Sequence, residues 1–336
     1  MNILVCITVV FAIITVGFIV RIFELTSKLT DKKFEMVDKK ANNINAYLML
    51  IFLILSFVGL YLVSDAYVPR SLYAIQPVTE HGEKLDWLFN ITLVACGFVF
   101  IISNIVLFYF AFRYKHHKDR KAYYFVESHK LELIWTVIPT IVMTYLIING
   151  GIVWKDVLMT QAPEDSFVIE VTGKQFAWII RYPGKDGKFG KTIPKIRTPE
   201  NPLGLDLSDP NAQDDIIVPG AAGFYMPVNQ PVLLKINALD VLHAPYLPHF
   251  RVKMDAIPGM TTQFWFVPNM TTNAIRAKIG DEDFNYEMAC AELCGKSHFA
   301  MKSVVFVDEI KAVNEWLETR KPFAVKFKEK QMALQQ

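Results

Sequence analysis

A short segment near the C-terminus holds most of the residues in this chain that could bind a redox-active metal. Cys290 and Cys294 are separated by three residues, His298 and Met301 follow them, and His243 comes from an earlier part of the chain. Thiolate and thioether are soft ligands that favour copper(I), and imidazole suits copper in both oxidation states. The combination therefore predicts a copper site that can gain and lose an electron.

Other chemistries would use parts of the same set of residues. Two cysteines on the exported side of a membrane could form a disulfide, and two Cys with two His could bind zinc. Met301 is a poor zinc ligand, however, and a mononuclear blue-copper site would use only one of the two cysteines. The full set favours copper held by both thiolates.

These residues need a scaffold that joins two separate loops. Cys290 and Cys294 are close enough in sequence for both sulfur atoms to bridge a pair of metal ions. A β-sandwich would place them, with His298 and Met301, in the loop between its last two strands. His243 must arrive from another loop, so we expect the site to form only once the sandwich has folded.

The composition of the chain requires membrane spans to be considered before any fold. Hydrophobic residues make up 52% of the sequence,. Four segments contain no Asp, Glu, Lys or Arg and approach or exceed the ~17–25 residues that span a bilayer as a helix. They are Ile3–Val20, Tyr47–Val63, Leu88–Phe112 and Leu133–Trp154. The alternative is that these segments are buried helices of a soluble protein, but the presence of four such segments favours membrane spans.

Lys and Arg are distributed unevenly among the connections between these spans. The second connection has only Arg70 and Lys84. The first and third are rich in basic residues: Arg21, Lys28, Lys32, Lys33, Lys39 and Lys40, and Arg113, Lys115, Lys118, Arg120, Lys121 and Lys130. The positive-inside rule places these two in the cytoplasm, so the N-terminus and everything after Trp154 lie outside. The first span lacks a basic n-region and a small-residue cleavage site, which favours an anchor over a removed signal peptide.

The remaining composition narrows the function further. Cys6 and Cys96 lie inside predicted spans and are expected to act as small apolar residues. The formal net charge is +2 and much of the basic content lies in the cytoplasmic loops, so nothing indicates nucleic-acid binding. The sequence has no Cys-x2-Cys-His motif, which predicts that no c-type haem is attached to this chain,.

After Glu164 the pattern changes from long apolar segments to short alternating ones. It predicts half-buried strands over 166–172, 232–237, 263–267, 274–279 and 302–308,. Short strands at this spacing are typical of an antiparallel β-sandwich or barrel. We expect residues 198–215 to be a surface insertion, 310–319 to be a helix, and the segment from Lys321 to be a mobile tail.

Four stretches of the sequence resemble subunit II of the haem–copper cytochrome c oxidases. They are Leu131–Thr140, Asp240–Pro248, Lys253–Gly259 and Cys290–Met301. The resemblance covers about residues 88–308, and the motifs are specific when they are taken together.

This resemblance implies a dinuclear copper centre in a cupredoxin-like domain. The two thiolates would bridge the ions, with one imidazole for each ion and two weak axial ligands. The implied ligands are His243, Cys290, Glu292 through its carbonyl, Cys294, His298 and Met301. In the family the electron comes from a cytochrome c, here expected to be a separate polypeptide or domain, and passes to haem in subunit I, where dioxygen is reduced and protons are pumped.

The resemblance also implies further site residues. The Glu292 side chain would reach a magnesium ion shared with subunit I; the alternative is that Glu292 is a solvated surface acid. Asp255 would either support the magnesium ion through a water molecule or stabilise a turn. His249 matches no family ligand and is expected to be structural or on the surface. Phe176 stands at the position where a Trp commonly receives the electron in this family. Trp178, two residues later, could take part in electron entry, but a place in the core of the sandwich explains Trp178 equally well.

Glu132, at the cytoplasmic start of the fourth span, has two interpretations. The resemblance makes it the mouth of a proton pathway into subunit I. A solvated carboxylate stabilised by the helix dipole is the alternative.

The expected architecture is four transmembrane helices followed by an exported cupredoxin-like antiparallel β-sandwich. Its parts are an extra N-terminal hairpin (1–66), an exported loop (67–87), the hairpin usual in the family (88–155), the copper domain (164–309) and a C-terminal helix and tail (310–336). The expected location is the bacterial inner membrane, with the copper domain on the periplasmic side, among subunit I, other oxidase subunits and lipid. The extra hairpin could also pack on another respiratory complex.

Three other functions remain open for this sequence. The chain could be the copper-bearing subunit of a related nitric oxide reductase, or a metal-free structural subunit of a quinol oxidase, although the latter would lack the ligands. It could also be an assembly protein that delivers copper, which the long aromatic exported domain disfavours.

Overall fold

A computed structural model of the chain describes residues 3–29, 39–71, 75–117 and 119–333, with side chains from residue 14 onward except 28 and 29. The chain divides into two compact units. One consists of residues 1–62 and 99–127, and the other of residues 63–98 and 128–336.

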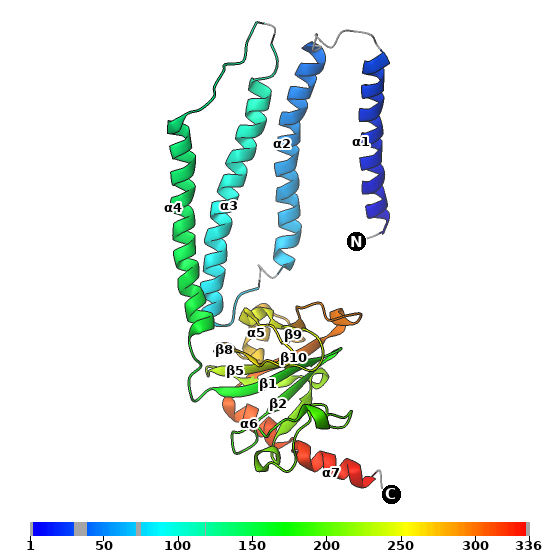
Figure 1. Cartoon of the computed structure of the whole chain (residues 1–336), viewed down its shortest axis with the longest axis vertical. Helices are drawn as coiled ribbons and strands as arrows, with labels where there is room; N and C mark the ends of the chain where they lie inside the picture. Colours follow the sequence, from blue (N-terminus) through cyan, green and yellow to red (C-terminus); the bar gives the residue numbers. More distant parts are fainter. Residues whose placement is uncertain (1–2, 30–38, 72–74, 118, 334–336) are drawn as a thin grey trace. The chain divides into compact units, whose positions relative to one another are not determined.

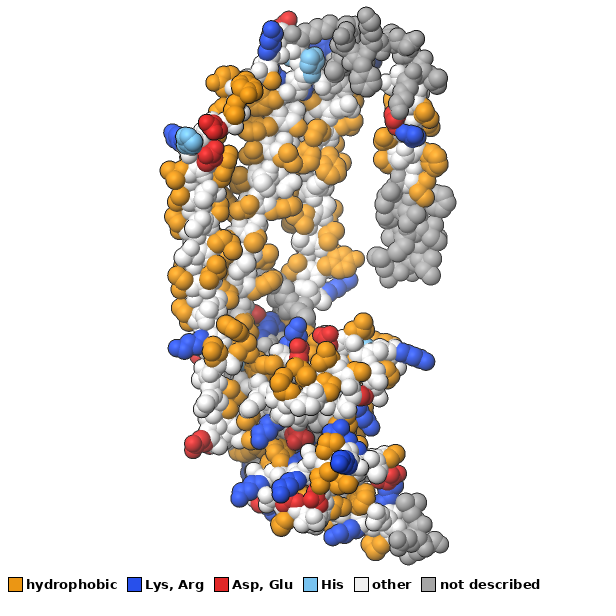
Figure 2. Space-filling model, viewed as in Figure 1, with side chains coloured by type: hydrophobic (Ala, Val, Ile, Leu, Met, Phe, Trp, Pro, Cys, Tyr) orange, Lys and Arg blue, Asp and Glu red, His pale blue; other side chains and the backbone are white. Residues whose placement is uncertain are grey.

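The N-terminal half of the chain is helical (Figure 1). Its helices are α1 (Ile3–Leu29), α2 (Lys39–Tyr67), α3 (Glu80–Arg113) and α4 (His129–Trp154). Within the described residues, α2, α3 and α4 are long and apolar enough to cross a membrane. Figure 2 shows hydrophobic side chains along these helices and charged ones mainly at helix ends and on the strand-rich part.

The first of the four predicted spans, Ile3–Val20, stays a prediction. Ile3–Val20 falls in α1, but the side chains of residues 3–13, Cys6 included, lie outside the described residues. Cys96 is a free thiol exposed on α3, as expected of a small apolar residue on a membrane helix,.

The C-terminal half of the chain forms two five-stranded sheets that pack as a sandwich. One sheet has the order β3-β2-β1-β5-β8 and the other β4-β10-β9-β6-β7. The strands are β1 (Phe167–Lys174), β2 (Ala177–Tyr182), β3 (Ile216–Pro219), β4 (Phe224–Pro227), β5 (Val232–Ala238), β6 (Pro245–Leu247), β7 (Val252–Lys253), β8 (Thr262–Phe266), β9 (Tyr286–Cys290) and β10 (Lys302–Asp308).

Alternation along the strands builds the core between the two sheets. In β5, Val232, Leu234 and Ile236 are fully buried, whereas Leu233 and Lys235 between them are partly exposed. Such side chains join residues such as Phe224 of the other sheet in one hydrophobic cluster. Burying a side chain of this size contributes about 1.5–3 kcal/mol, so the alternating pattern accounts for the sandwich.

The sheets are mixed, so the prediction of a purely antiparallel sandwich was wrong. β1 pairs with β5 in parallel, and β4 pairs with β10 in parallel. Alternation of apolar residues is the same for both directions and does not encode which one forms. A parallel pair needs a long crossover between its strands, and β2, β3 and β4 lie between β1 and β5 in the sequence.

The predicted strand over 274–279 is instead a helix, α5 (Thr272–Ile279). The Thr271 side chain caps it by accepting a hydrogen bond from the Ala274 N–H at 3.1 Å, and Gly280, with φ of 71°, ends it in the left-handed conformation,. Ile275 and Ile279 are four residues apart, a spacing that fits one helix face as well as it fits alternation. The capping residues decide between the two.

The C-terminal segment is more ordered than expected. The predicted helix over 310–319 is confirmed as α6 (Ile310–Glu318), but the segment expected to be a mobile tail forms α7 (Phe323–Ala333). The insertion at 198–215 is not only a surface loop, because Leu203, Leu205 and Ala212 within it are buried.

Candidate metal centre

Two loops at one end of the sandwich carry the predicted metal ligands. β9 ends at Cys290 and β10 begins at Lys302, so Cys294, His298 and Met301 lie in the loop between them, as predicted. His243 lies in the separate connection between β5 and β6. The pairing of β6 with β9, which places Pro245 opposite Cys290, brings the two loops together.

The predicted ligand atoms converge. The sulfur atoms of Cys290 and Cys294 are 3.9 Å apart. His243 Nδ1 lies 3.9 Å from the sulfur of Cys290, and His298 Nδ1 lies 3.5 Å from the sulfur of Cys294. Met301 Sδ is 3.9 Å from the sulfur of Cys294. All of these residues are buried except His298, which is half-buried.

The sulfur separation distinguishes between the chemistries open to these cysteines. A disulfide requires about 2.05 Å, and both Cys290 and Cys294 are free thiols. A metal–thiolate bond is about 2.3 Å long, so one ion can contact both sulfur atoms when they are 3.9 Å apart. A thioether beside two thiolates favours copper over zinc. The donor set therefore fits copper.

Asp240 holds His243 in the orientation that a metal would require. An oxygen of its carboxylate lies 2.8 Å from His243 Nε2, which leaves Nδ1 facing the cysteine sulfurs. The same carboxylate accepts hydrogen bonds from the N–H groups of Gln175 and Val241, both at 2.7 Å. Burial alone would raise the pKa of Asp240, but these hydrogen bonds outweigh it and lower the pKa. This role of Asp240 was not predicted, although Asp240 stands at the start of the motif that contains His243.

The turn between β1 and β2 lies over the ligand loop. The Gln175 side-chain amide donates to the Cys294 carbonyl at 2.6 Å, and the Trp178 indole N–H lies 3.4 Å from the Met301 carbonyl. Trp178 is 2% exposed, and its ring meets that of His243 edge-on at 6.0 Å. Trp178 is therefore part of the sandwich core, whereas Phe176 in the same turn is half-buried.

The residues considered for magnesium do not form a cluster. The Glu292 side chain is exposed, and its carbonyl lies 3.2 Å from the sulfur of Cys290, on the side of the copper ligands. Asp255 is exposed, and its carbonyl accepts a hydrogen bond from the Thr262 hydroxyl at 2.5 Å. Among the described residues, the His, Cys, Asp and Glu side chains that converge in a group of three or more are His243, Cys290 and Cys294. Nothing here supports magnesium.

His249 and Glu132 both lie apart from the converging ligands. His249 packs against the rings of Phe284 and Tyr286, and burial lowers its pKa to about 4, so it is a neutral structural residue. Glu132 lies in the first turn of α4, where one of its oxygens is 3.4 Å from His129 Nδ1. This position fits both interpretations of Glu132.

Apolar helices long enough to cross a membrane, followed by a β-sandwich with a Cys/His metal centre, define a membrane-anchored redox protein. The family models described as cytochrome c oxidase subunit II, transmembrane domain and periplasmic domain, match residues 68–149 and 167–308. The chain belongs to the cytochrome c oxidase subunit II family. It is therefore a membrane-anchored subunit whose β-rich domain is periplasmic.

Two relatives named as cytochrome c oxidase subunits agree with this assignment. The chain is 35% identical over 248 residues to the alternative cytochrome c oxidase subunit 2 of Bradyrhizobium diazoefficiens, covering 74% of this chain and 84% of the relative. It is 27% identical over 246 residues to cytochrome c oxidase subunit 2 of Cereibacter sphaeroides, covering 70% and 75%. The crystal structure of the periplasmic domain of subunit II of the Bradyrhizobium japonicum cytochrome oxidase aligns with 30% identity and a TM-score of 0.32, covering 47% of this chain and 96% of that one.

Proposed function

We propose that this chain accepts electrons for a cytochrome c oxidase at a dinuclear copper centre. The observation that carries the proposal is that five potential ligand side chains converge, two of them cysteines whose sulfur atoms are 3.9 Å apart. They are His243, Cys290, Cys294, His298 and Met301, with the carbonyl of Glu292 beside Cys290. Copper bound there supplies one-electron transfer between a cytochrome c and the haem of subunit I.

Backbone hydrogen bonds fix the two loops that carry these ligands, so the ligands need to move little when an electron is gained or lost. Cys290 ends a strand, its N–H donates to the Met301 carbonyl at 3.1 Å, and the Ala291 N–H donates to the Ala244 carbonyl at 2.9 Å. Trp178 packs against the ring of His243, and both side chains are buried. Because both loops are fixed by backbone hydrogen bonds, the ligand positions change little when an electron leaves.

Loading of the site must release a proton from Cys294. Burial, followed by the charge of the neighbouring Cys290, raises the pKa of the Cys294 thiol above its usual value. A metal ion binds the thiolate and not the thiol, so metal binding displaces this proton and strengthens as pH rises.

A separate cytochrome c would reach the centre across an apolar surface. Phe176 lies in the turn whose Gln175 side chain donates to the Cys294 carbonyl. Leu293 and Phe299, both on the ligand loop, are each 80% exposed. Both side chains stand on the loop that carries the proposed ligands, and an apolar patch on this loop would suit a protein contact, which supports electron transfer close to it.

Partner subunits supply the rest of the reaction. Subunit I would hold the haems and the dioxygen-reducing site, and the membrane helices would pack against it within lipid. A proton pathway beginning at Glu132 and a magnesium ion shared through Glu292 belong to the same proposal and rest on the family resemblance. Replacement of Glu132 by Gln tests the first of these: it should lower proton uptake from the cytoplasmic side and leave copper reduction unchanged.

The rival functions are less well supported. A structural subunit of a quinol oxidase would have no reason to hold five ligand side chains together. The relatives compared above are named as cytochrome c oxidase subunits, and none is named as a nitric oxide reductase. Oxygen consumption by the purified complex, with nitric oxide as the competing substrate, separates these two enzymes.

Electron paramagnetic resonance of the copper-loaded complex is the decisive test. Hyperfine structure from one unpaired electron shared equally by two copper nuclei is expected. A signal confined to a single copper, or a Cys290–Cys294 disulfide in the isolated complex, would contradict the proposal.

A further inference from the structure

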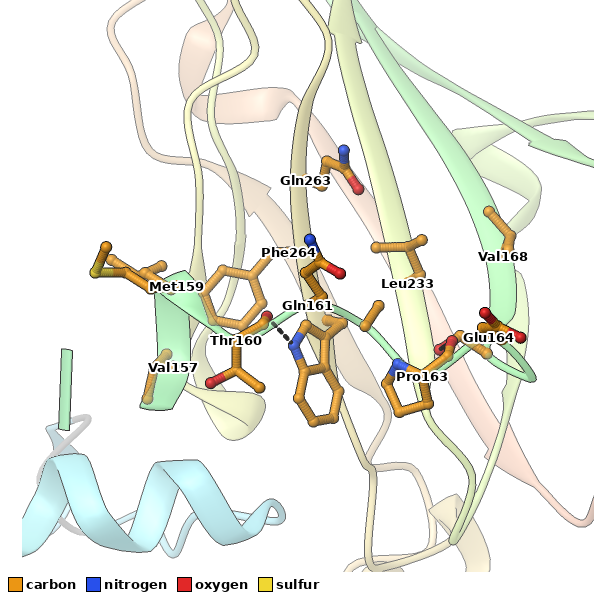
Figure 3. Close-up of a pocket in the computed structure, with 14 residues that line it drawn as sticks. Val157, Met159, Thr160, Gln161, Pro163, Glu164, Val168, Leu233, Gln263 and Phe264 are labelled. Carbon is orange, nitrogen blue, oxygen red and sulfur yellow. Dashed lines mark hydrogen bonds between the residues drawn. The ribbon is translucent and has the colours of Figure 1, made fainter. Parts of the chain in front are cut away.

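A cavity of about 560 Å³ lies where the chain leaves α4 and enters the sandwich (Figure 3). One wall is the segment 157–164 that follows α4, and the other is the edge of the first sheet. The sheet residues are Val168 of β1, Leu233 of β5, and Gln263, Phe264 and Trp265 of β8. The copper ligands do not line this cavity, so it needs a separate explanation.

The cavity lies at the exported end of α4, where Val157, Leu158 and Met159 line it and the candidate membrane span His129–Met159 ends. Helix α4 ends at Trp154, a π-helical turn covers Lys155–Met159, and the wall begins at Val157. Val157 is three residues past Trp154, which is about 5 Å at 1.5 Å per residue. The polar layer of a bilayer is about 5–8 Å thick on each side of its hydrocarbon core. A lipid headgroup at the exported end of this span is therefore within reach of the cavity.

Trp265 is held in place as one wall of the cavity. Its neighbours Phe264 and Phe266 are buried in the core, whereas Trp265 is half-buried. Its indole N–H donates to the Thr160 carbonyl at 2.8 Å, the dashed line in Figure 3. This bond lies in the plane of the ring and leaves the ring face available. The face of an indole attracts a cation.

The charges in the cavity select the kind of ligand. Among its lining residues in the described part of the chain, Glu164 is the charged one, and none is Lys or Arg. The other polar side chains are neutral: Thr160, Gln161, Ser166 and Gln263. Figure 3 shows Glu164 and Pro163 on the side of the cavity near Val168, with Val157 and Met159 on the opposite side. An anionic group would find no cation here, whereas an ammonium group would find a carboxylate, amide oxygens and a ring face.

An exposed apolar surface leads from the membrane span into the cavity. Trp154, Leu158 and Met159 are 60%, 45% and 67% exposed. Acyl chains can lie against such side chains while the headgroup enters the cavity.

We propose that this cavity binds the headgroup of a phospholipid with a primary amine, of the phosphatidylethanolamine type, from the outer leaflet. The ammonium group lies between Glu164 and the face of Trp265 and donates to the side-chain oxygens of Gln161 and Gln263. A primary ammonium has three N–H donors for these acceptors, whereas the quaternary ammonium of phosphatidylcholine has none.

Lipid retention by the purified oxidase complex tests this proposal. The complex is equilibrated in bilayer discs that contain equal amounts of phosphatidylethanolamine, phosphatidylcholine and phosphatidylglycerol. It is then washed with detergent, and the retained lipids are measured by mass spectrometry. The wild-type complex should retain phosphatidylethanolamine preferentially, and Glu164→Gln should lower this retention about fivefold or more because a charge-assisted hydrogen bond is lost. The matched control is Asp165→Asn, an exposed neighbour that does not line the cavity, and it should retain the lipid as the wild type does.

A second variant separates loss of the site from loss of the fold. Trp265→Leu should also lower retention of phosphatidylethanolamine, with the copper signal unchanged as a measure of an intact sandwich. If its copper signal is lost, the Glu164→Gln comparison decides alone. Equal retention of the three lipids by the wild type, or wild-type retention by Glu164→Gln, would overturn the proposal.

Discussion

The metal-binding loops and the foot of the sandwich are built in opposite ways. We use "foot" for residues 75–86 together with 248–251. Four of the five ligand side chains come from the single segment 290–301, and their types indicate their chemistry. At the foot, Arg251 donates from Nε and Nη2 to the two carboxylate oxygens of Asp86, at 2.8 and 2.9 Å. These two residues are far apart in the sequence and are ordinary in type.

The foot ties the beginning of α3 to the strands that position the ligands. Arg251 also donates to the carbonyls of Pro248 and Ile75, both at 2.6 Å, and the Val78 N–H donates to the His249 carbonyl at 2.9 Å. Residues 248–251 join β6 to β7, and β6 pairs with β9, which carries Cys290. The foot therefore fixes the ligand loops relative to the start of α3.

The two regions therefore have different roles. The ligand loops provide the side chains that would bind copper, and the foot fixes the position of these loops relative to the start of α3. Damage to the loops should remove the copper centre from an intact sandwich. Damage to the foot should leave the copper centre and disturb electron transfer to subunit I.

The largest effect is expected at the ligand loops. Cys294→Ser replaces a thiolate that would contact both ions with a hydroxyl, which is a poor ligand for copper. The dinuclear signal in electron paramagnetic resonance should disappear, and oxidation of cytochrome c by the complex should fall below detection. Cys96→Ser on α3 is the control and should change neither. A dinuclear signal retained in Cys294→Ser would refute the assigned ligand set.

The next largest effect is expected at the foot. Asp86→Asn weakens the paired hydrogen bonds to Arg251 and should lower the free energy of unfolding by about 1.5–3 kcal/mol. The copper signal should be unchanged, while stopped-flow reduction of haem by the copper centre should be slower. Glu83→Gln, an exposed acid in the same helix, is the matched control. If stability falls and the rate of haem reduction does not, the foot serves folding alone.

These two regions also show what the sequence could predict. The side chains that converge could be named from the sequence because soft and imidazole ligands at such spacing have few other uses, and the loop of Cys294, His298 and Met301 was placed correctly between the last two strands. The bond from Arg251 to Asp86 could not be found, because no pattern marks one Arg and one Asp so far apart as partners. Strand direction failed for the same reason, since β1 meets β5 only after three intervening strands. The helix α5 could have been found, because Thr271 and Gly280 are ordinary capping residues on either side of it.

Asp240 shares a property with each region: its residue type alone does not indicate a function, as at the foot, but its carboxylate contacts the proposed ligand His243. Asp240→Asn removes the charge that orients His243 and should weaken copper binding about 10–100-fold. The measurement is competition for copper against a chelator of known affinity, with Asp255→Asn as the control. Unchanged affinity in Asp240→Asn would mean that the backbone of the loop alone orients His243.

The smallest effect on electron transfer is expected at Asp215, which lies in neither region and acts on stability alone. It is fully buried, 3.3 Å from an Arg181 guanidinium nitrogen, and accepts a hydrogen bond from the Gly190 N–H at 3.0 Å. Burial nevertheless raises its pKa from 3.8 to about 6, against the opposing effect of Arg181. A folded-state pKa above the unfolded value means that the folded state favours the protonated acid. Ionisation of Asp215 should therefore lower the free energy of unfolding as pH rises from about 4 to about 6.5.

Asp215→Asn should remove this dependence on pH. Because other groups titrate in the same range, the informative quantity is the free energy of unfolding of the variant minus that of the wild type. This difference should increase between pH 4 and pH 6.5 and then become constant, as measured by denaturant unfolding monitored by tryptophan fluorescence. The exposed acid Glu282, replaced by Gln, should give a difference that does not change with pH. A constant difference for Asp215→Asn would mean that Arg181 and Gly190 stabilise the carboxylate fully, and that a buried charge in this sandwich costs no more than one at the surface.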